Sequence, residues 1–350
     1  MATILFENVA VFDGENPQLR DPAFVLVEGN RIREVSDRPI RQSGTERIDG
    51  SGRTLMPGMI DCHVHVYVHS VRLGTADRPP TYYAHYAATF LRDILACGFT
   101  SVRDVAGGDH GLAMALAKGW IDGPRFFYGG RALSQTGGHG DFRGPGVPAH
   151  EYCMCGAERN ELAILADGVD ACIKAVREEL RKGAHHIKIM GSGGIMSPSD
   201  PIDRCQYSDA EILAIVDECR RRGAYVAAHC HPDEAVLRSA RLGVRTIEHA
   251  TLISDATARE VVDRGAFVVP TFSVMGAIQS DGKAMGIAQR SLDKLAAVVD
   301  HAYAGLETMK RAGVKLGFGT DLLAEQHTRQ GTEFTMRAEV LSPFEILRSA

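Results

Sequence analysis

Short apolar segments alternate with longer amphipathic segments from residue 59 onward, and this alternation restricts the possible folds more than any other feature. Eight of the apolar segments have the length and the bulky, often β-branched side chains of strands. They are Met59–His63, Thr100–Val105, Arg125–Gly129, His186–Met190, Ala224–His229, Thr246–His249, Phe267–Pro270 and Lys315–Thr320. Such a succession of strands and helices predicts an α/β fold with a parallel sheet.

The segments between the apolar runs have the periodicity of helices. In residues 167–183 apolar side chains recur every three or four positions, and a further helix is predicted from Ser291 to Gly313. Ser208 and Glu211 form a capping-box pattern at the start of another helix. We expect the eight strand–helix units to close into a (β/α)8 barrel of the TIM type, not a doubly wound open sheet. Polar residues recur at the strand ends, where barrel active sites lie.

Residues 1–56 have a different pattern. Ile4–Phe12 and Phe24–Val35 are rich in β-branched and aromatic residues, and Gly29-Asn30 is a turn signal. We therefore predict a β-sandwich portion over residues 1–56 and a metal-dependent hydrolase barrel over residues 57–350. Residues 131–166 are long and Gly-rich, and we expect an irregular loop there.

Charge and composition exclude several classes of partner. The 350 residues have a formal net charge of -5, so there is no basic excess to neutralise the phosphates of a nucleic acid. No segment approaches the ~20 apolar residues of a membrane span, and the N-terminus lacks the pattern of a signal peptide. Eight cysteines scattered through a chain of this length predict reduced thiols in a cytoplasmic protein.

A His-x-His pair ends the first predicted barrel strand. His63 and His65 are two residues apart, so their side chains lie on one face of a strand. Imidazole is the usual nitrogen ligand for zinc and similar metals. A bare pair of this kind also fits two unrelated histidines, and the preceding Pro57-Gly58-Met59-Ile60-Asp61 favours the metal site.

Four residues on other strands converge with this pair at one end of the predicted barrel. Lys188 lies on the face opposite its isoleucine neighbours, inside the barrel, where an unpaired lysine charge is costly. It fits either a lysine paired with a carboxylate or one converted by carbon dioxide to a metal-bridging carbamate. His229 and His249 end the fifth and sixth strands. Asp321 ends the eighth, where it fits either a helix N-cap or a metal-bound carboxylate.

These motifs resemble those of the amidohydrolase superfamily, specifically the branch of Xaa-Pro dipeptidases and Xaa-amino-acid carboxypeptidases with binuclear metal sites. The resemblance covers essentially the whole chain. It rests on Pro57–His65, Thr100–Asp104, Ala132–His139, Ile187–Gly194, Thr246–His249 and Gly317–Asp321. Family members usually continue with strands that complete the sandwich, and we expect that half to be absent from these 350 residues.

The resemblance implies a site for two divalent metal ions, expected to be zinc. His63, His65 and Asp321 would hold the first ion. His229 and His249 would hold the second. A carbamate on Lys188 and a hydroxide would bridge both.

The resemblance also implies the reaction. The hydroxide would cleave the amide bond of a dipeptide, such as Xaa-Pro, or of an N-acyl amino acid with a free carboxylate, with Asp321 as general base and then general acid. His139 and Tyr207 resemble residues that polarise the scissile carbonyl or hold the carboxylate; they also fit a loop histidine and a packed tyrosine.

Pro232 suggests that the chain has left its strand before His231, which we therefore leave outside the site. We expect a homo-oligomer.

Two alternatives remain open from the sequence. The substrate could be another amide, such as the cyclic amide imidazolonepropionate, a carbamate or an N-acyl aromatic amino acid toxin. The chain could also be a non-catalytic barrel scaffold. A scaffold would be expected to lose metal ligands, and all six predicted ligands are present.

Overall fold

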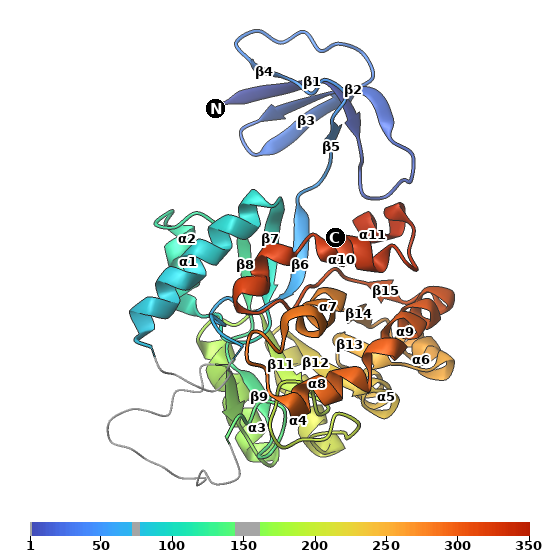
Figure 1. Ribbon diagram of the computed structural model, residues 1–350. Helices are drawn as coiled ribbons and strands as arrows, with labels where there is room; N and C mark the ends of the chain where they lie inside the picture. Colours follow the sequence, from blue (N-terminus) through green and yellow to red (C-terminus); the bar gives the residue numbers. More distant parts are fainter. Residues whose placement is uncertain (1, 72–77, 144–161) are drawn as a thin grey trace. The chain divides into compact units, whose positions relative to one another are not determined.

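The computed structural model describes residues 2–71, 78–143 and 162–350, and the chain forms two compact units (Figure 1). The first unit comprises Met1–Gly58 with Pro343–Arg348, and the second comprises Met59–Ser342 with Ser349–Ala350. The functional division predicted between residues 56 and 57 stays a prediction.

The first unit contains a five-stranded sheet. Its strands are β1 (Thr3–Val11), β2 (Arg20–Glu28), β3 (Arg31–Ser36), β4 (Glu46–Asp49) and β5 (Thr54–Leu55), in the order β3-β2-β1-β4 with β5 also paired to β1. Successive side chains of a strand point to opposite faces. Phe24 and Leu26 accordingly pack with Leu5 on one face, and Val25 packs with Val9 on the other.

The second unit is built from parallel strands. They are β6 (Met59–Val64), β7 (Phe99–Asp104), β8 (Arg125–Tyr128), β9 (Ala132–Ser134), β10 (Ala163–Leu165), β11 (His186–Met190), β12 (Tyr225–Pro232), β13 (Thr246–Leu252), β14 (Phe267–Val269) and β15 (Lys315–Leu316). One sheet has the order β10-β9-β11-β12-β13-β14-β15, and the other has the order β6-β7-β8. The predicted α/β fold with a parallel sheet is confirmed.

Helices connect these strands, and the helices of the second unit lie around them in Figure 1. They are α1 (Pro80–Ala96), α2 (His110–Ala117), α3 (Val169–Arg181), α4 (Asp209–Arg221), α5 (Asp233–Arg241), α6 (Asp255–Asp263), α7 (Phe272–Asp281), α8 (Gln289–Ala296), α9 (Val299–Ala312), α10 (Thr332–Arg337) and α11 (Pro343–Ser349), with a 3-10 helix at Ala324–Arg329. The capping box at Ser208 and Glu211 is confirmed at the start of α4. Among the described helices, none combines the length and the apolarity that crossing a membrane requires.

Three predictions about local structure are wrong. The helix expected from Ser291 to Gly313 is two helices, because Val298 leaves helical geometry at φ -124° and ψ -22°. The loop expected over 131–166 contains β9 and β10, which are too short to show periodicity; residues 144–161 of that loop lie outside the described residues. Strand β12 runs through His231, because Pro232 has an extended conformation and ends the strand without interrupting it.

A buried ion pair joins α10 to two strand ends of the second unit. Arg337 donates hydrogen bonds to Glu333 Oε1 at 2.6 Å, to the Pro270 carbonyl at 2.7 Å and to the Gly317 carbonyl at 3.1 Å. Glu333 Oε2 accepts the Ser273 N–H at 2.6 Å. Both charged side chains are fully buried, so the attraction between them is needed to offset the cost of removing each charge from water.

Arg337→Met is expected to lower the free energy of unfolding by about 3–5 kcal/mol, because it leaves the Glu333 carboxylate buried without its partner. Chemical denaturation monitored by circular dichroism measures the change. Arg181→Met is the control, since the pair of Arg181 with Glu178 is exposed to water and should contribute little to the free energy of unfolding. Equal losses in the two variants would contradict the role of the buried pair.

Candidate metal centre

The six predicted metal ligands line one pocket of the second unit. They come from β6, β11, β12 and β13 and from the segments that follow β6 and β15: His63, His65, Lys188, His229, His249 and Asp321. The Asp321 N–H donates to the His63 carbonyl at 2.9 Å, which explains how residues more than 250 positions apart meet. The structure therefore brings together all six residues chosen from the sequence.

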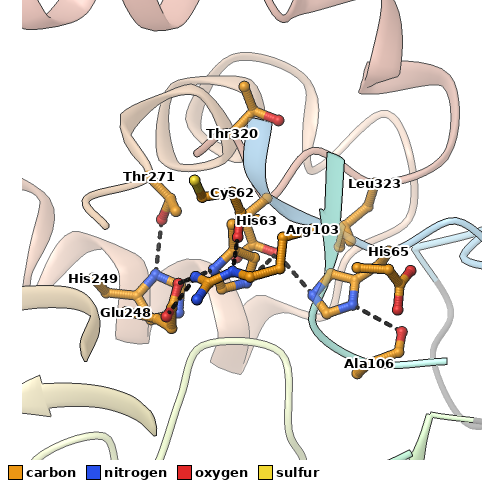
Figure 2. Close-up of polar contacts among 12 residues, drawn as sticks. Cys62, His63, His65, Arg103, Ala106, Glu248, His249, Thr271, Thr320 and Leu323 are labelled. Atoms are coloured by element: carbon orange, nitrogen blue, oxygen red, sulfur yellow. Dashed lines mark hydrogen bonds and ion pairs between the residues drawn. The ribbon is translucent and has the colours of Figure 1, made fainter. Parts of the chain in front are cut away.

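The imidazoles of His63 and His65 contact Glu248 and Ala106 through one ring nitrogen (Figure 2) and approach Asp321 through the other. His63 Nδ1 lies 2.8 Å from Glu248 Oε2, and His65 Nδ1 lies 3.2 Å from the Ala106 carbonyl oxygen. The Nε2 atoms lie 3.4 Å and 3.1 Å from Asp321 Oδ1. When Nδ1 donates to these outer oxygens, Nε2 is left with a lone pair for a metal ion.

His249 and His229 complete the ring of imidazoles. The Nδ1 of His249 lies 2.7 Å from Thr271 Oγ1 (Figure 2). When Nδ1 donates to this hydroxyl oxygen, Nε2 is left with a lone pair for a metal ion. The orientation of His229 is reversed, with Nε2 3.2 Å from the Gly193 carbonyl oxygen, which leaves Nδ1 available. Donor atoms of His63, His249 and Asp321 lie within 4.8 Å of one another.

Glu248 is an important site residue that the sequence analysis missed. It is fully buried between His63 and Arg103, whose Nη2 lies 2.8 Å and 2.9 Å from the two carboxylate oxygens. Burial raises the pKa of Glu248, but Arg103 and His63 outweigh burial and leave it lower than usual. An ionised Glu248 therefore fixes the orientation of His63. Arg103 thus acts on the site through this carboxylate.

Backbone geometry explains why Glu248 and His249 both face the interior. Adjacent residues of a regular strand point to opposite faces. His249 has a left-handed φ of 71°, which breaks the alternation at that point. Asp321 is also left-handed, at φ 54°. Strained backbone of this kind often occurs at functional sites, and here it is found at two predicted ligands.

The charges of the pocket depend on one another. Burial lowers the pKa of Lys188, which is 2% exposed, and no hydrogen bond or ion pair reaches its Nζ from the described residues. Burial also lowers the pKa of His63 to about 4. For Asp321 burial acts in the opposite direction, but His63, His65 and Lys188 outweigh it and lower the pKa to about 2. The pocket thus combines neutral imidazole, an ionised carboxylate and a lysine whose pKa is lower than usual.

The two predicted substrate contacts have different positions. His139 lines the pocket, with its ring stacked on that of His229 at a centroid distance of 4.2 Å. Burial lowers the pKa of His139 to about 4. Tyr207 is not part of this pocket wall as the described residues form it. It is buried in the turn before α4, where its N–H donates to Gln135 Oε1 at 2.6 Å and its side chain lies close to Cys172. The packed-tyrosine interpretation fits Tyr207 better.

His231 lines the pocket although the sequence analysis left it out. Its Nδ1 lies 2.9 Å from Thr251 Oγ1, and its ring stacks on that of His249 at 4.9 Å. Donor atoms of His229, His231 and His249 lie within 4.8 Å of one another. The signal was present in the sequence, because His229 and His231 are two positions apart on one strand.

Comparisons with known proteins are consistent with this geometry. Residues 54–350 match a family model described as the amidohydrolase family. Ochratoxinase from Aspergillus niger is 30% identical over an alignment of 364 positions, which covers 99% of this chain and 75% of that protein. A crystal structure of a prolidase complexed with N-methylphosphonate-L-proline has a TM-score of 0.96 and 45% identity, covering 100% of this chain and 86% of its own. A Xaa-Pro dipeptidase with bound methionine has a TM-score of 0.90 and 26% identity, covering 100% and 87%.

Proposed function

The chain belongs to the amidohydrolase family and is a hydrolase acting on C–N bonds, and from this premise we propose that it cleaves a dipeptide such as Xaa-Pro, or an N-acyl amino acid, at a centre of two zinc ions. The observation that carries the proposal is the convergence of six ligand-type residues in one buried pocket. The 45% identity to a prolidase supports the dipeptide. A cytoplasmic location and a homo-oligomer stay predictions.

We also propose that the parallel strands of the second unit close into a (β/α)8 barrel. Backbone hydrogen bonds of 2.7 Å from Cys62 to Phe318 and of 2.9 Å from Asp321 to His63 join β6 to the segment after β15. The His185 N–H donates to the Tyr128 carbonyl at 2.9 Å, which joins β8 to the start of β11. These contacts support a ring in which the ligands share one mouth.

The residues present fit divalent metal ions. The pocket offers imidazole nitrogens and a carboxylate, the donors that zinc prefers, and outer oxygens hold Nδ1 of three of the histidines. His63, His65 and Asp321 would hold one ion, and His229 and His249 the other. When bound, the ions would act as Lewis acids that polarise the scissile carbonyl and make water a better nucleophile.

Carboxylation of Lys188 would supply the ligand common to both ions. The neutral amine would attack carbon dioxide: an N–C bond would form as one C=O π bond opens onto its oxygen, and one proton would pass from the nitrogen to water, which would give an anionic carbamate. Burial favours the neutral amine that this step requires, because it lowers the pKa of Lys188.

The protein groups have separable roles in hydrolysis. Asp321 is ionised, so it would accept the proton of the attacking water and pass it to the amine nitrogen as the C–N bond breaks. His139 would donate a hydrogen bond to the carbonyl oxygen as negative charge develops there. Glu248 and Arg103 would keep the imidazole of His63 in place.

A second candidate substrate is an N-acyl aromatic amino acid. The pocket wall beyond the ligands is largely apolar, with Phe142, Ile195, Met275 and Ile278 among its residues. An aromatic or other apolar group would be desolvated favourably against these side chains. The similarity to ochratoxinase supports the same choice.

Turnover of a substrate library by zinc-loaded protein tests the function. We expect Xaa-Pro dipeptides and N-acyl amino acids to be hydrolysed, and their amidated counterparts, which lack the free carboxylate, to be poor substrates. A preference for the N-acyl aromatic set would select the second candidate. Stoichiometric zinc without hydrolysis of any member of the library would contradict both.

Metal uptake is expected to weaken as the pH falls. Burial lowers the pKa of His65, but the hydrogen bond and charge of Asp321 and the charge of Asp104 outweigh burial and raise it above its usual value. Below that raised pKa, His65 carries a proton that a metal ion must displace, so binding releases a proton and the affinity rises with pH. Calorimetric zinc titrations at about pH 6 and about pH 8, in buffers of different ionisation enthalpy, measure the affinity for zinc and the number of protons released. Equal affinities at the two pH values would contradict this prediction.

A further inference from the structure

His139 lies directly against the glycine-rich segment that follows β11. A Cβ atom added to Gly194 would lie 2.2 Å from His139 Cε1 and 2.5 Å from both ring nitrogens. The imidazole therefore fills the space that any other residue at position 194 would occupy. The position of His139 consequently depends on how this segment, residues 191–206, is held.

Lys294 of α8 holds that segment from a position about one hundred residues further along the chain. Its Nζ donates to the Gly194 carbonyl at 2.8 Å and to the Ser197 carbonyl at 3.0 Å, and it lies 3.6 Å from Asp200 Oδ1. The Lys294 side chain is only 17% exposed. A lysine with little access to water that donates to two carbonyls is a specific anchor, unlike a surface lysine.

Asp200 and Gln206 extend this anchor to the backbone of His139. The carboxylate of Asp200 is 3% exposed, and its Oδ2 accepts from the Gly194 N–H at 3.0 Å and from Gln206 Nε2 at 3.2 Å. Gln206 Oε1 in turn accepts the His139 N–H at 2.9 Å. The backbone of His139 and the segment against its ring are thus tied to the same buried carboxylate.

The Ser197 hydroxyl lies between the ring of His139 and the Gly194 carbonyl. It is 2.8 Å from His139 Nδ1 and 3.3 Å from the Gly194 carbonyl oxygen. That carbonyl already accepts a charged donor, Lys294, at 2.8 Å. Asp200 Oδ2 lies 3.7 Å from the same Nδ1, beyond hydrogen-bond distance, so the hydroxyl is the nearer partner. The shorter distance to Nδ1 and the donor that the Gly194 carbonyl already has both favour donation from Ser197 to His139 Nδ1.

We propose that Lys294 is a positioning residue that, through Ser197, keeps the ring proton of neutral His139 on Nε2, where it can be donated to the substrate's carbonyl oxygen. With Nδ1 accepting, a neutral imidazole carries its proton on Nε2. The inference rests on the proposed function for the role of the carbonyl oxygen. The tautomer itself follows from the contacts of Lys294, Ser197 and Gly194.

Lys294→Met and Ser197→Ala test this through kinetics. On the best substrate from the library, kcat is expected to fall on the order of 10-fold to 100-fold, with KM within about twofold and zinc content unchanged. Lys283→Met is the matched control, because Lys283 is exposed just after α7, and it should keep the wild-type rate. In a His139→Gln background, Lys294→Met should cost nothing further, since the group it positions is gone. Losses that add in the double variant, or wild-type rates in both single variants, would overturn the proposal.

The tautomer can be measured without any substrate. Nitrogen-15 NMR of histidine-labelled, zinc-loaded protein identifies the His139 signals by their loss in His139→Gln. We expect a protonated Nε2 and an accepting Nδ1 in the wild type, and a shift toward the other tautomer in Lys294→Met and Ser197→Ala. A protonated Nδ1 in the wild type would overturn the proposal. Because this readout needs no turnover, an inactive wild type would refute the proposed function and leave the tautomer to be decided by NMR.

Discussion

Lys188→Ala is expected to reduce hydrolysis by roughly 10³-fold or more, because it would remove the ligand proposed to be shared by two metal ions and with it several kcal/mol of stabilisation of the transition state. The effect should be on kcat, and metal content should fall below that of the wild type. Metal analysis and steady-state kinetics on the same preparation measure both. Acetate or propionate should restore part of the rate, since a small carboxylate can occupy the space vacated by the carbamate.

The matched control for this variant is Lys174→Ala, at an exposed lysine of α3. It should retain wild-type activity and metal. Carbon-13 NMR with labelled bicarbonate should show a carbamate signal in the wild type that is absent from Lys188→Ala. Full activity in Lys188→Ala would refute the carbamate assignment.

Asp321→Asn is the second change with a large expected effect. Hydrolysis should fall on the order of 10²-fold to 10⁴-fold, because asparagine cannot accept and return the proton that general acid–base catalysis requires. The fold should be retained, since asparagine matches aspartate in size and tolerates the left-handed φ of 54° at this position. Single-turnover kinetics and thermal unfolding measure the two quantities separately.

Asp263→Asn, at an exposed aspartate at the end of α6, is the control for the substitution itself. It should change neither the rate nor the unfolding temperature. A wild-type rate in Asp321→Asn would exclude Asp321 from proton transfer. A large loss of stability in that variant would show instead that the carboxylate is needed for the structure.

Family, fold class and the six candidate ligands could be predicted from the sequence because each depends on local pattern. Alternating apolar runs and amphipathic segments specify strands and helices. In parallel α/β folds the carboxyl ends of strands lie at one edge, so histidines placed there are brought together without knowledge of any contact. His63, His65, His229, His249 and Asp321 all satisfy that rule, and they line one pocket.

Tyr207 shows the limit of the same approach. It was chosen by resemblance, and among the described residues it lies in a turn beside Cys172 and not in the pocket wall, so its role in catalysis stays a prediction. His231 was left out because Pro232 follows it and was expected to lie beyond the strand. That conclusion was wrong, because a proline that ends a strand disturbs none of the residues before it. Both cases concern where a side chain points, which periodicity decides only for regular backbone.

The sequence by itself determined the order of strands and helices, the family and which residues gather at the strand ends, since these depend on patterns within a few residues of one another. Only the tertiary structure decided that Glu248 faces the interior beside His249 and that Arg103 stabilises the ionised form of Glu248. It also decided that Lys294 reaches the segment beside His139. These contacts join segments far apart in the chain, and one depends on a left-handed φ. The physical reason is that a buried charge is compensated by a group that is distant in the sequence and packs against it in the fold. No local sequence pattern records that packing.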